Sequence, residues 1–160
     1  MSGLHLPPPI LKALLPVCTL IQPMLAEPFT RAQGQGAALS AWSSRANPAE
    51  VRCRITAVSA VYVAWDVRRT CRYVGSVCRE GSTAVGDRLS EHYRDRSAGA
   101  SRRADWALLT VLPLHPDLHV KDVRIAEGWA ARRLGPLDGS AHPMVNLATP
   151  PASLLVPRCG

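Results

Sequence analysis

Tyr62, Arg88 and Glu127 are side chains whose chemical types can together hydrolyse a phosphodiester bond. That reaction needs a positioned water molecule, neutralisation of charge on the phosphoryl oxygens and a proton for the leaving oxygen. Arg88 offers a planar guanidinium that can contact two phosphate oxygens at once. Glu127 offers one carboxylate to a divalent metal ion. Mg²⁺ commonly takes one or two carboxylates and keeps waters and substrate phosphate as its other ligands, so a single Glu is sufficient.

Tyr62 is expected either to act as a general base or to position the attacking water. A free phenol has a pKa near 10, so a general base at neutral pH would need its pKa lowered by about 3 units. A nearby metal ion or Arg88 would act in that direction. Tyr73 and His92 are expected to be supporting hydrogen-bond donors to phosphate or water. His92 lies four residues after Arg88, which places both on one face of a helix.

Each of these residues also has an ordinary structural interpretation. Tyr62 and Tyr73 are of a type that is common in strands. Arg88 and His92 fit a solvated helix face, and Glu127 would lie at the edge of an apolar face or in an ion pair. The functional interpretation therefore depends on all five occurring together, on elements that bring them to one place.

The elements that must position these side chains follow from the pattern of apolar residues. Runs rich in β-branched and aromatic residues indicate strands, and apolar residues at helical spacing indicate helices. The predicted elements are, in order, strand 55–65, strand 71–77, helix 83–94, strand 106–114 and helix 120–134. The short turn after the first strand favours a hairpin, which would bring Tyr62 near Tyr73. The order predicts an α+β fold with a small three-stranded antiparallel sheet flanked by helices.

Residues 55–150 resemble the GIY-YIG nuclease superfamily in the order of these motifs. The sequence Ala-Val-Tyr at 60–62 stands for the first family triplet, and Tyr-Val-Gly at 73–75 stands for the second. The residues that follow in family order are Arg88, His92, Glu127 and Asn146, the last within a Pro-x-x-Asn ending. Two features depart from the family pattern: Ala60 replaces the first glycine, and the intervals before Arg88 and Asn146 are longer than in compact members.

The resemblance implies a divalent-metal-dependent endonuclease that hydrolyses DNA phosphodiester bonds with Mg²⁺ or Mn²⁺. The catalytic residues that it implies are Tyr62, Tyr73, Arg88, His92, Glu127 and Asn146. Glu127 would be the metal ligand and Asn146 would shape the site. The alternative from another functional class is a noncatalytic nucleic-acid-binding module with the same fold, although a pure binder has no need of the single carboxylate.

The charge of the chain agrees with a polyanionic partner such as DNA. Residues 51–160 contain 16 basic and 10 acidic residues, a net charge of +6, while residues 1–50 have a net charge of +1. A positive charge of this size favours a polyanion, and its ordinary interpretation is that it maintains solubility. Because no second DNA-binding domain is recognisable, a separate partner protein that directs the chain to DNA is a further alternative.

The five cysteines indicate reduced thiols and a cytoplasmic location. An odd number of this size does not suit a secreted disulfide framework. Cys53, Cys71 and Cys78 could meet His92 around zinc, but no CxxC pair exists and the spacings match no common zinc pattern. No apolar run of about 18 residues lacks both proline and charge, so no membrane partner is expected.

Residues 1–50 differ in composition from the rest of the chain and suggest a division at residue 50. They are expected to be a proline-rich, apolar N-terminal extension and linker, poorly ordered in part, followed by the nuclease-like domain at 51–160. The apolar residues that could share one helical face are Ile10, Leu14, Ile21 and Leu25. Pro16 and Pro23 are expected to interrupt that helix, so the segment is expected to be dispensable for folding. An interaction protein in which residues 1–50 matter most is a further alternative.

Overall fold

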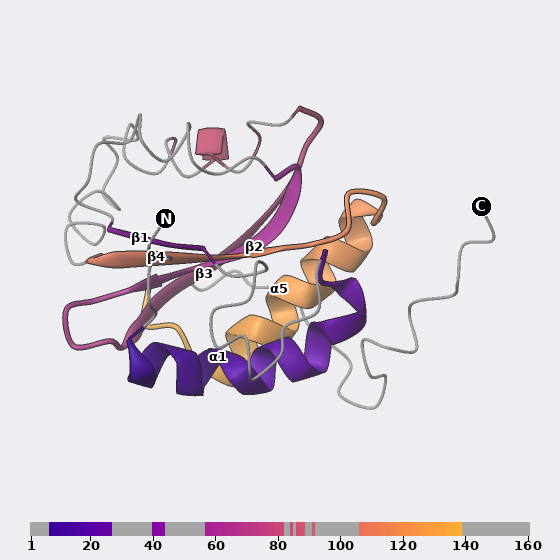
Figure 1. The fold of residues 1–160 in the computed structure, drawn as a ribbon. Helices are drawn as coiled ribbons and strands as arrows, with labels where there is room; N and C mark the ends of the chain where they lie inside the picture. Colours follow the sequence, from indigo (N-terminus) through magenta and orange to yellow (C-terminus); the bar gives the residue numbers. More distant parts are fainter. Residues whose placement is uncertain are drawn as a thin grey trace, which may run out of the picture.

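The computed structural model describes residues 7–26, 40–43, 57–81, 84, 86–88, 91 and 106–138, with the backbone alone described at 40–43. Its elements are α1 (Pro8–Ile21), the 3-10 helix η1 (Gln22–Met24), β1 (Ser40–Ser43), β2 (Ser59–Trp65), β3 (Cys71–Cys78), β4 (Leu108–Pro113) and α5 (Val120–Leu134). They form one sheet with α1 and α5 packed on the same side of it (Figure 1).

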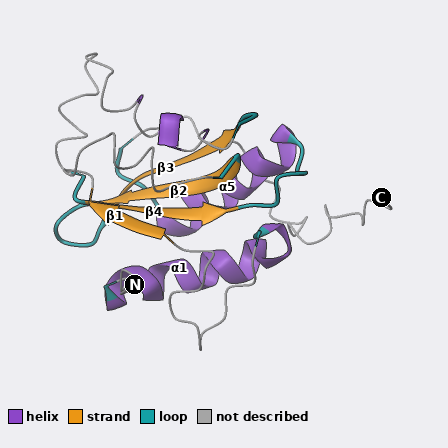
Figure 2. Ribbon diagram, turned by 45° about the horizontal axis from the view of Figure 1, so that its top comes forward, coloured by secondary structure: helices purple, strands orange, loops and turns teal. Residues whose placement is uncertain are grey.

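The sheet has the strand order β1-β4-β2-β3, and all of its pairs are antiparallel. The predicted α+β class is confirmed, because β2, β3 and β4 are the three expected antiparallel strands. Figure 2 shows the four strands side by side, with α1 lying along one side of them.

β1 lies within the segment that was expected to be a linker. Its sequence, Ser-Ala-Trp-Ser, has little intrinsic preference for a strand. It pairs with the outer edge of β4, from Ser40 opposite Val111 to Ser43 opposite Leu108. A strand that depends on a partner about 70 residues away leaves little trace in its own local pattern, which is why the sequence analysis did not predict it.

β2 is buried along its whole length and divides the core into two layers. Side chains of a strand alternate between the two faces of its sheet. Val61 and Val63 point into the layer that contains the buried residues of α1 and α5. Ala60 and Tyr62 point into the opposite layer. Tyr62 therefore lies on the sheet face away from the two described helices.

α1 is part of the core, which argues against the expectation that residues 1–50 are dispensable for folding. The residues expected to share one face, Ile10, Leu14, Ile21 and Leu25, are all buried, the first three on α1 and Leu25 just after η1. Leu25 forms a β-bridge with Leu114, and the His115 amide donates to the carbonyl of Met24. These contacts join the end of this segment to the end of β4.

Pro16 lies inside α1, so the expectation that it interrupts the helix is wrong. A proline in a helix removes one backbone hydrogen bond and crowds the preceding turn. Here Leu14 and Val17, on either side of Pro16, are fully buried in the core. We attribute the continuity of the helix to this burial, because each fully buried aliphatic side chain contributes about 1.5–3 kcal/mol. Pro23 falls in η1, after α1 has ended.

α5 has the predicted bounds, and both of its ends are capped. The His119 side chain accepts a hydrogen bond from the Lys121 amide at the N-terminus, at 3.1 Å. Gly135 ends the helix with φ of 58°, in the left-handed conformation that glycine adopts without strain. Asp122 lies in the first turn and Arg132 and Arg133 in the last, which suits the helix dipole.

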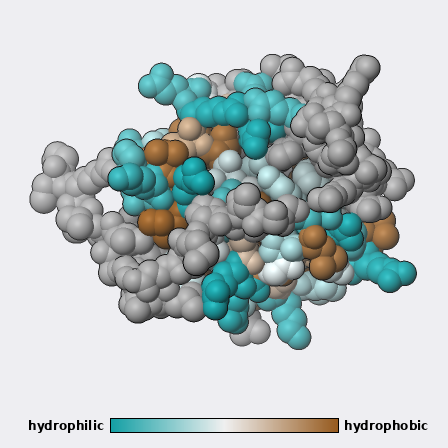
Figure 3. Space-filling model, turned by 180° about the vertical axis from the view of Figure 1, so that it is seen from behind, coloured by the Kyte–Doolittle hydropathy of each residue, from teal (hydrophilic) through white to brown (hydrophobic). Residues whose placement is uncertain are grey.

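The described surface shows no single large apolar patch on the face drawn in Figure 3, where hydrophobic areas are separated by hydrophilic ones. The exposed large apolar side chains are Val67, Val120 and Leu137, which come from three different parts of the chain. Among the described residues, none of the helices is long and apolar enough to cross a membrane.

Candidate active site

The Tyr62 ring lies across Gly75, its cross-strand partner in the β2–β3 pair. A Cβ atom added to Gly75 would stand only 2.5 Å from both Cζ and the hydroxyl oxygen of Tyr62. No residue with a side chain fits there unless the Tyr62 ring moves. Because β3 is the outer strand of the described sheet, the tip of the Tyr62 ring reaches from an inner strand to that edge.

Tyr62 begins a row of three aromatic side chains on the same face. The rings of Tyr62 and Tyr73 are stacked with centroids 6.1 Å apart, and Tyr73 and Trp106 are tilted with centroids 5.2 Å apart. The Trp106 indole N–H donates to Asp138 at 3.4 Å. Asp138 in turn accepts two hydrogen bonds from Arg72, both 3.1 Å long. The row therefore has a hydrogen-bonded support at its far end, which limits the movement of Tyr73.

Arg88 supplies a positive charge to the Tyr62 hydroxyl. Residues 84, 86–88 and 91 have helical backbone. The Arg88 guanidinium donates a side-chain hydrogen bond to Tyr62. It also donates from Nη1 to Glu91 Oε2 at 2.9 Å, an ion pair between residues three apart. Arg88 is therefore held at two points, one on the sheet and one on its own segment.

Glu127 lies on α5, and its charge acts on the same hydroxyl. This helix packs against β3 and β2, and Glu127 is half-buried next to the core residue Ala126. Its charge acts on Tyr62 and opposes ionisation of the phenol. The Tyr62 side chain points to the face of the sheet opposite to the one that α5 covers.

Burial is the main influence on the pKa of Tyr62 and raises it above the ordinary value of 10. The neighbouring Tyr73 raises it further, the charge and hydrogen bond of Arg88 lower it, and Glu127 raises it again. The net effect is a raised pKa for Tyr62, so the phenol is protonated at neutral pH. Of the two roles expected for Tyr62, a hydrogen-bonding and water-positioning role agrees with this environment better than that of a general base.

Glu91 and Arg79 are neighbours of the site that the sequence analysis did not single out. Arg79 holds the Glu91 carboxylate with two hydrogen bonds, Nη1 to Oε1 at 2.6 Å and Nη2 to Oε2 at 3.1 Å. The hydrogen bonds from Arg79 lower the pKa of Glu91 from 4.5 to about 2, against an opposing effect of burial and with further help from Arg88. The spacing of Arg88 and Glu91 was the available signal, because residues three apart on a helix are neighbours.

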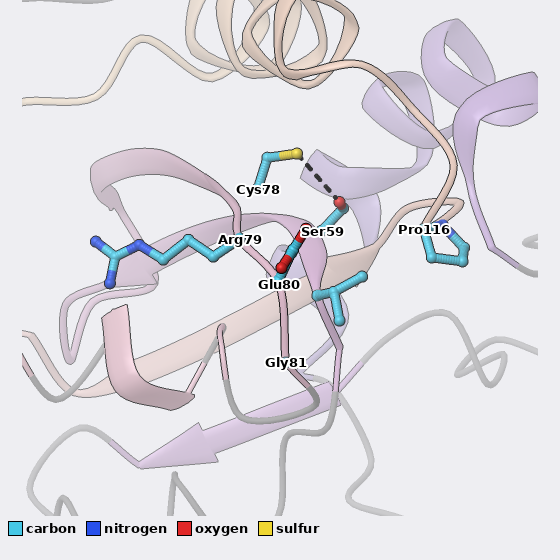
Figure 4. A pocket seen from close by; sticks show the side chains of 7 residues that line it. Ser59, Cys78, Arg79, Glu80, Gly81 and Pro116 are labelled. Carbon is cyan, nitrogen blue, oxygen red and sulfur yellow. Dashed lines mark hydrogen bonds between the residues drawn. The ribbon is translucent and has the colours of Figure 1, made fainter.

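Tyr73 and Arg88, two of the predicted site residues, contact Tyr62, and the charge of a third, Glu127, acts on it. His92 and Asn146 lie outside the described residues, so their predicted roles stay predictions. The pocket in Figure 4, with a volume of about 390 Å³, is lined by none of these four described residues; it lies beside Ser59, Cys78 and Pro116 and is also lined by Arg79.

The cysteines in the described part of the chain do not belong to this site. Cys18, Cys71 and Cys78 are free thiols, and burial raises the pKa of Cys18 and of Cys71 to about 12. No group of three or more His, Cys, Asp or Glu residues suited to a metal ion occurs among the described residues. Glu127 therefore remains the single described carboxylate that the sequence analysis assigns to a metal.

The fold and site were compared with known proteins in three ways. No protein-family model, no curated protein sequence and no solved structure matches this chain.

Proposed function

We propose that the chain is a divalent-metal-dependent endonuclease that hydrolyses DNA phosphodiester bonds with a site of the GIY-YIG type. The observation that carries the proposal is the environment of one hydroxyl group. Tyr62 accepts a hydrogen bond from Arg88, stacks on Tyr73 and lies within the electrostatic influence of Glu127. Three residues of the predicted set thus act on a fourth, Tyr62, although 65 positions separate Tyr62 from Glu127.

Each residue has a role in the hydrolysis that follows from its chemistry. The oxygen of water forms a bond to phosphorus as that water gives up a proton to solvent, the bond from phosphorus to the leaving sugar oxygen breaks, and the leaving oxygen takes up a proton from solvent. The Arg88 guanidinium neutralises charge on a nonbridging oxygen, an interaction that strengthens as charge develops in the transition state. The protonated Tyr62 positions the water by hydrogen bonding, and Tyr73 holds the Tyr62 ring.

Mg²⁺ or Mn²⁺ is the metal cofactor that fits this donor set. The half-buried Glu127 offers one hard oxygen ligand, and Mg²⁺ keeps several waters and accepts substrate phosphate beside one or two carboxylates. When bound, the metal supplies charge neutralisation at the phosphate and activates water. The sequence also assigns His92 and Asn146 to this site, as a donor and as a shaping residue.

DNA is the substrate that the charge of the chain favours. The net charge of +6 on residues 51–160 attracts a polyanion over its whole surface. A separate partner protein that selects the DNA site is compatible with a chain of this size. We place the activity in the cytoplasm, where the free thiols Cys18, Cys71 and Cys78 stay reduced.

One observation favours a second function, that of a noncatalytic nucleic-acid-binding module. Tyr62 is 0% exposed, so its hydroxyl is enclosed in this structure. A phosphodiester that reacts there would require the site to open. A binder would use the exposed arginines around the site and leave Tyr62 as a core aromatic.

A cleavage assay separates the two functions. The full chain is incubated with supercoiled, linear and branched DNA in Mg²⁺, in Mn²⁺ and in excess EDTA. We expect cleavage with either metal and none with EDTA. Binding of DNA without cleavage on every substrate would reject the nuclease and support the binding module.

A further inference from the structure

Arg79, Glu91 and Arg88 form a continuous bridge from the end of β3 to the Tyr62 hydroxyl. The Arg79 guanidinium contacts both oxygens of Glu91, and Oε2 of the same carboxylate accepts from Arg88 Nη1. Arg88 then donates to Tyr62. Arg79 also lines the pocket drawn in Figure 4, where its side chain extends away from Ser59, Cys78 and Pro116.

The bridge begins at a point that the sheet fixes. Arg79 directly follows the last residue of β3, and its amide donates to the carbonyl of Val58 at 3.1 Å. Two parallel N–H···O contacts to one carboxylate hold that carboxylate in direction as well as position. Arg79, anchored to the sheet, thus holds the Glu91 carboxylate in the position in which it contacts Arg88.

The arrangement is suited to orienting a side chain rather than to stabilising the fold. The exposed fractions of the three side chains are 45% for Arg79, 37% for Glu91 and 36% for Arg88. Ion pairs with this exposure contribute little to folding, because water screens them and long side chains lose freedom. A guanidinium that is held at both ends, however, loses its freedom to rotate away from the group it serves.

We propose that Glu91 is a positioning residue that directs the Arg88 guanidinium toward the Tyr62 hydroxyl, and that Arg79 acts through Glu91. The role in cleavage rests on the proposed nuclease function, whereas the orientation of Arg88 does not. Glu91 does not touch the substrate in this proposal. Its effect on the reaction comes from presenting Arg88 in the direction that a phosphate oxygen beside Tyr62 requires.

Side-chain NMR of the full chain tests the orientation without any activity. The Arg88 Nε–Hε signal, assigned by its loss in Arg88→Lys, is expected to show restricted motion in the wild type. Glu91→Gln and Arg79→Ala are each expected to lower its heteronuclear NOE, with Tm unchanged within about 4 °C. Glu80→Gln and Arg68→Ala are matched controls, since both are exposed residues with the same charge changes. An Arg88 signal that is equally ordered in Glu91→Gln overturns the proposal.

Single-turnover DNA cleavage tests the consequence for the reaction. We expect Glu91→Gln to lower the rate about 10- to 100-fold without weakening DNA binding, because it removes a negative charge. Arg79→Ala should lower the rate in the wild type and have no further effect in the Glu91→Gln background. Additive losses in the double variant, or a Glu91→Gln rate equal to that of the Glu80→Gln control, would overturn the role.

The two measurements keep the failure of this proposal distinct from the failure of the nuclease function. A wild type that cuts no DNA rejects the nuclease, and the NMR comparison then decides whether Glu91 orients Arg88. A wild type that cuts, with a Glu91→Gln variant that cuts equally fast, leaves the nuclease intact and rejects the positioning role.

Discussion

The Tyr62 hydroxyl is the point at which the individual side chains of the site meet. Its ring crosses Gly75, its oxygen accepts from Arg88, and Glu127 acts on it from a helix. Burial, with Tyr73 and Glu127, raises its pKa against the opposing effect of Arg88, so the hydroxyl keeps its proton at neutral pH. The proposed site is therefore centred on one atom, the Tyr62 hydroxyl oxygen, and removal of that oxygen is the most selective change that can be made.

Tyr62→Phe should therefore leave the fold intact and slow cleavage. The ring keeps its stacking on Tyr73, while the Arg88 guanidinium loses one acceptor and turns toward solvent or Glu91. We expect the rate to fall about 10²-fold, because loss of the group that positions the water misplaces the nucleophile. Tyr73→Phe is the matched control for loss of a hydroxyl on the same sheet face and should have a smaller effect. Equal rates for Tyr62→Phe and the wild type would remove the hydroxyl from the mechanism.

Glu91 should titrate at unusually low pH. Hydrogen bonds from Arg79, and after them Arg88, lower its pKa from 4.5 to about 2. A carboxyl whose folded pKa is depressed contributes stability above its unfolded pKa and loses it as pH falls through the folded pKa. The contribution is therefore complete above about pH 4.5 and is lost between about pH 4.5 and 2, and exposure of the group keeps it small.

Carbon-detected NMR of the Glu91 carboxyl during an acid titration measures this pKa. Arg79→Ala should move the pKa back toward 4.5, whereas Arg68→Ala, which removes an exposed arginine elsewhere, should not. A titration midpoint near 4.5 for Glu91 in the wild type would show that, in solution, Arg79 and Arg88 do not form these hydrogen bonds with its carboxylate.

The sequence allowed the type and order of the site residues to be predicted, but not their immediate partners. Tyr62, Tyr73, Arg88 and Glu127 could be chosen because their chemistry and spacing were visible along the chain. Arg79 could not be chosen, because its role depends on a contact with Glu91, twelve positions away. The sequence does not show which way the segment that carries Glu91 faces. Trp106 was predicted only as a strand residue. Its hydrogen bond to Asp138 could not be predicted, because it depends on how the chain after α5 returns to β3.

At the scale of elements, the β2–β3 hairpin determines the geometry of the site. Its register places Tyr62 opposite Gly75 and Ala64 opposite Tyr73, and the turn between the strands is closed by Asp66, whose carboxylate accepts from the amides of Arg68 and Thr70. A shift of β2 by one residue in its strand register would place the Tyr62 side chain on the face of the sheet that α1 and α5 cover. The glycine at 75 is thus explained by packing, since the Tyr62 ring occupies the space of its missing side chain.

Gly75→Ala should destabilise the protein and displace Tyr62. The new Cβ would stand 2.5 Å from two atoms of the ring, so the ring or the strand must move. Overpacking of this kind costs about 1–3 kcal/mol in the free energy of unfolding, measurable by urea denaturation. Ser76→Ala, the next residue on the same strand, is the control and should change little. A Gly75→Ala variant as stable as the wild type would contradict the described position of the ring.

Elements with strong local signals were predictable, and elements formed by distant pairing were not. The bounds of α5 follow from its apolar spacing, its position after His119 and the glycine at 135. The hairpin follows from two strand-like runs with a short polar turn. β1 has no such signal and exists through its pairing with β4. α1 has an apolar face, but its prolines argue against a continuous helix. The burial of Leu14 and Val17, which offsets the effect of Pro16, depends on distant parts of the chain and is not visible in the local sequence.

At the scale of the whole molecule, the layer beneath the sheet is built from both ends of the described chain. α1 contacts α5, and the buried residues of both helices share one cluster with Val61, Val63 and Trp65 of β2. α5 also carries Glu127. The position of Glu127, the proposed metal ligand, therefore depends on packing to which the N-terminal segment contributes, which links residues 8–26 to the proposed site.

Leu14→Ala should destabilise the protein by about 2–5 kcal/mol, the usual cost of removing a fully buried leucine side chain. Lys12→Ala, on the exposed side of the same helix, should change the free energy of unfolding by no more than about 0.5 kcal/mol. Removal of residues 1–26 should abolish the cooperative thermal transition. A chain that starts near residue 48 and melts like the full chain would show that α1 is not needed for the core.

The central claim, that Tyr62, Arg88 and Glu127 form a metal-dependent nuclease site, is tested most directly by DNA cleavage and DNA binding of Glu127→Gln. The account predicts a loss of cleavage of about 10²-fold or more, with DNA affinity equal to or above that of the wild type because one negative charge is removed. Asp122→Asn makes the same charge change on α5 and should cut DNA normally. Cleavage by Glu127→Gln at the wild-type rate would contradict the account.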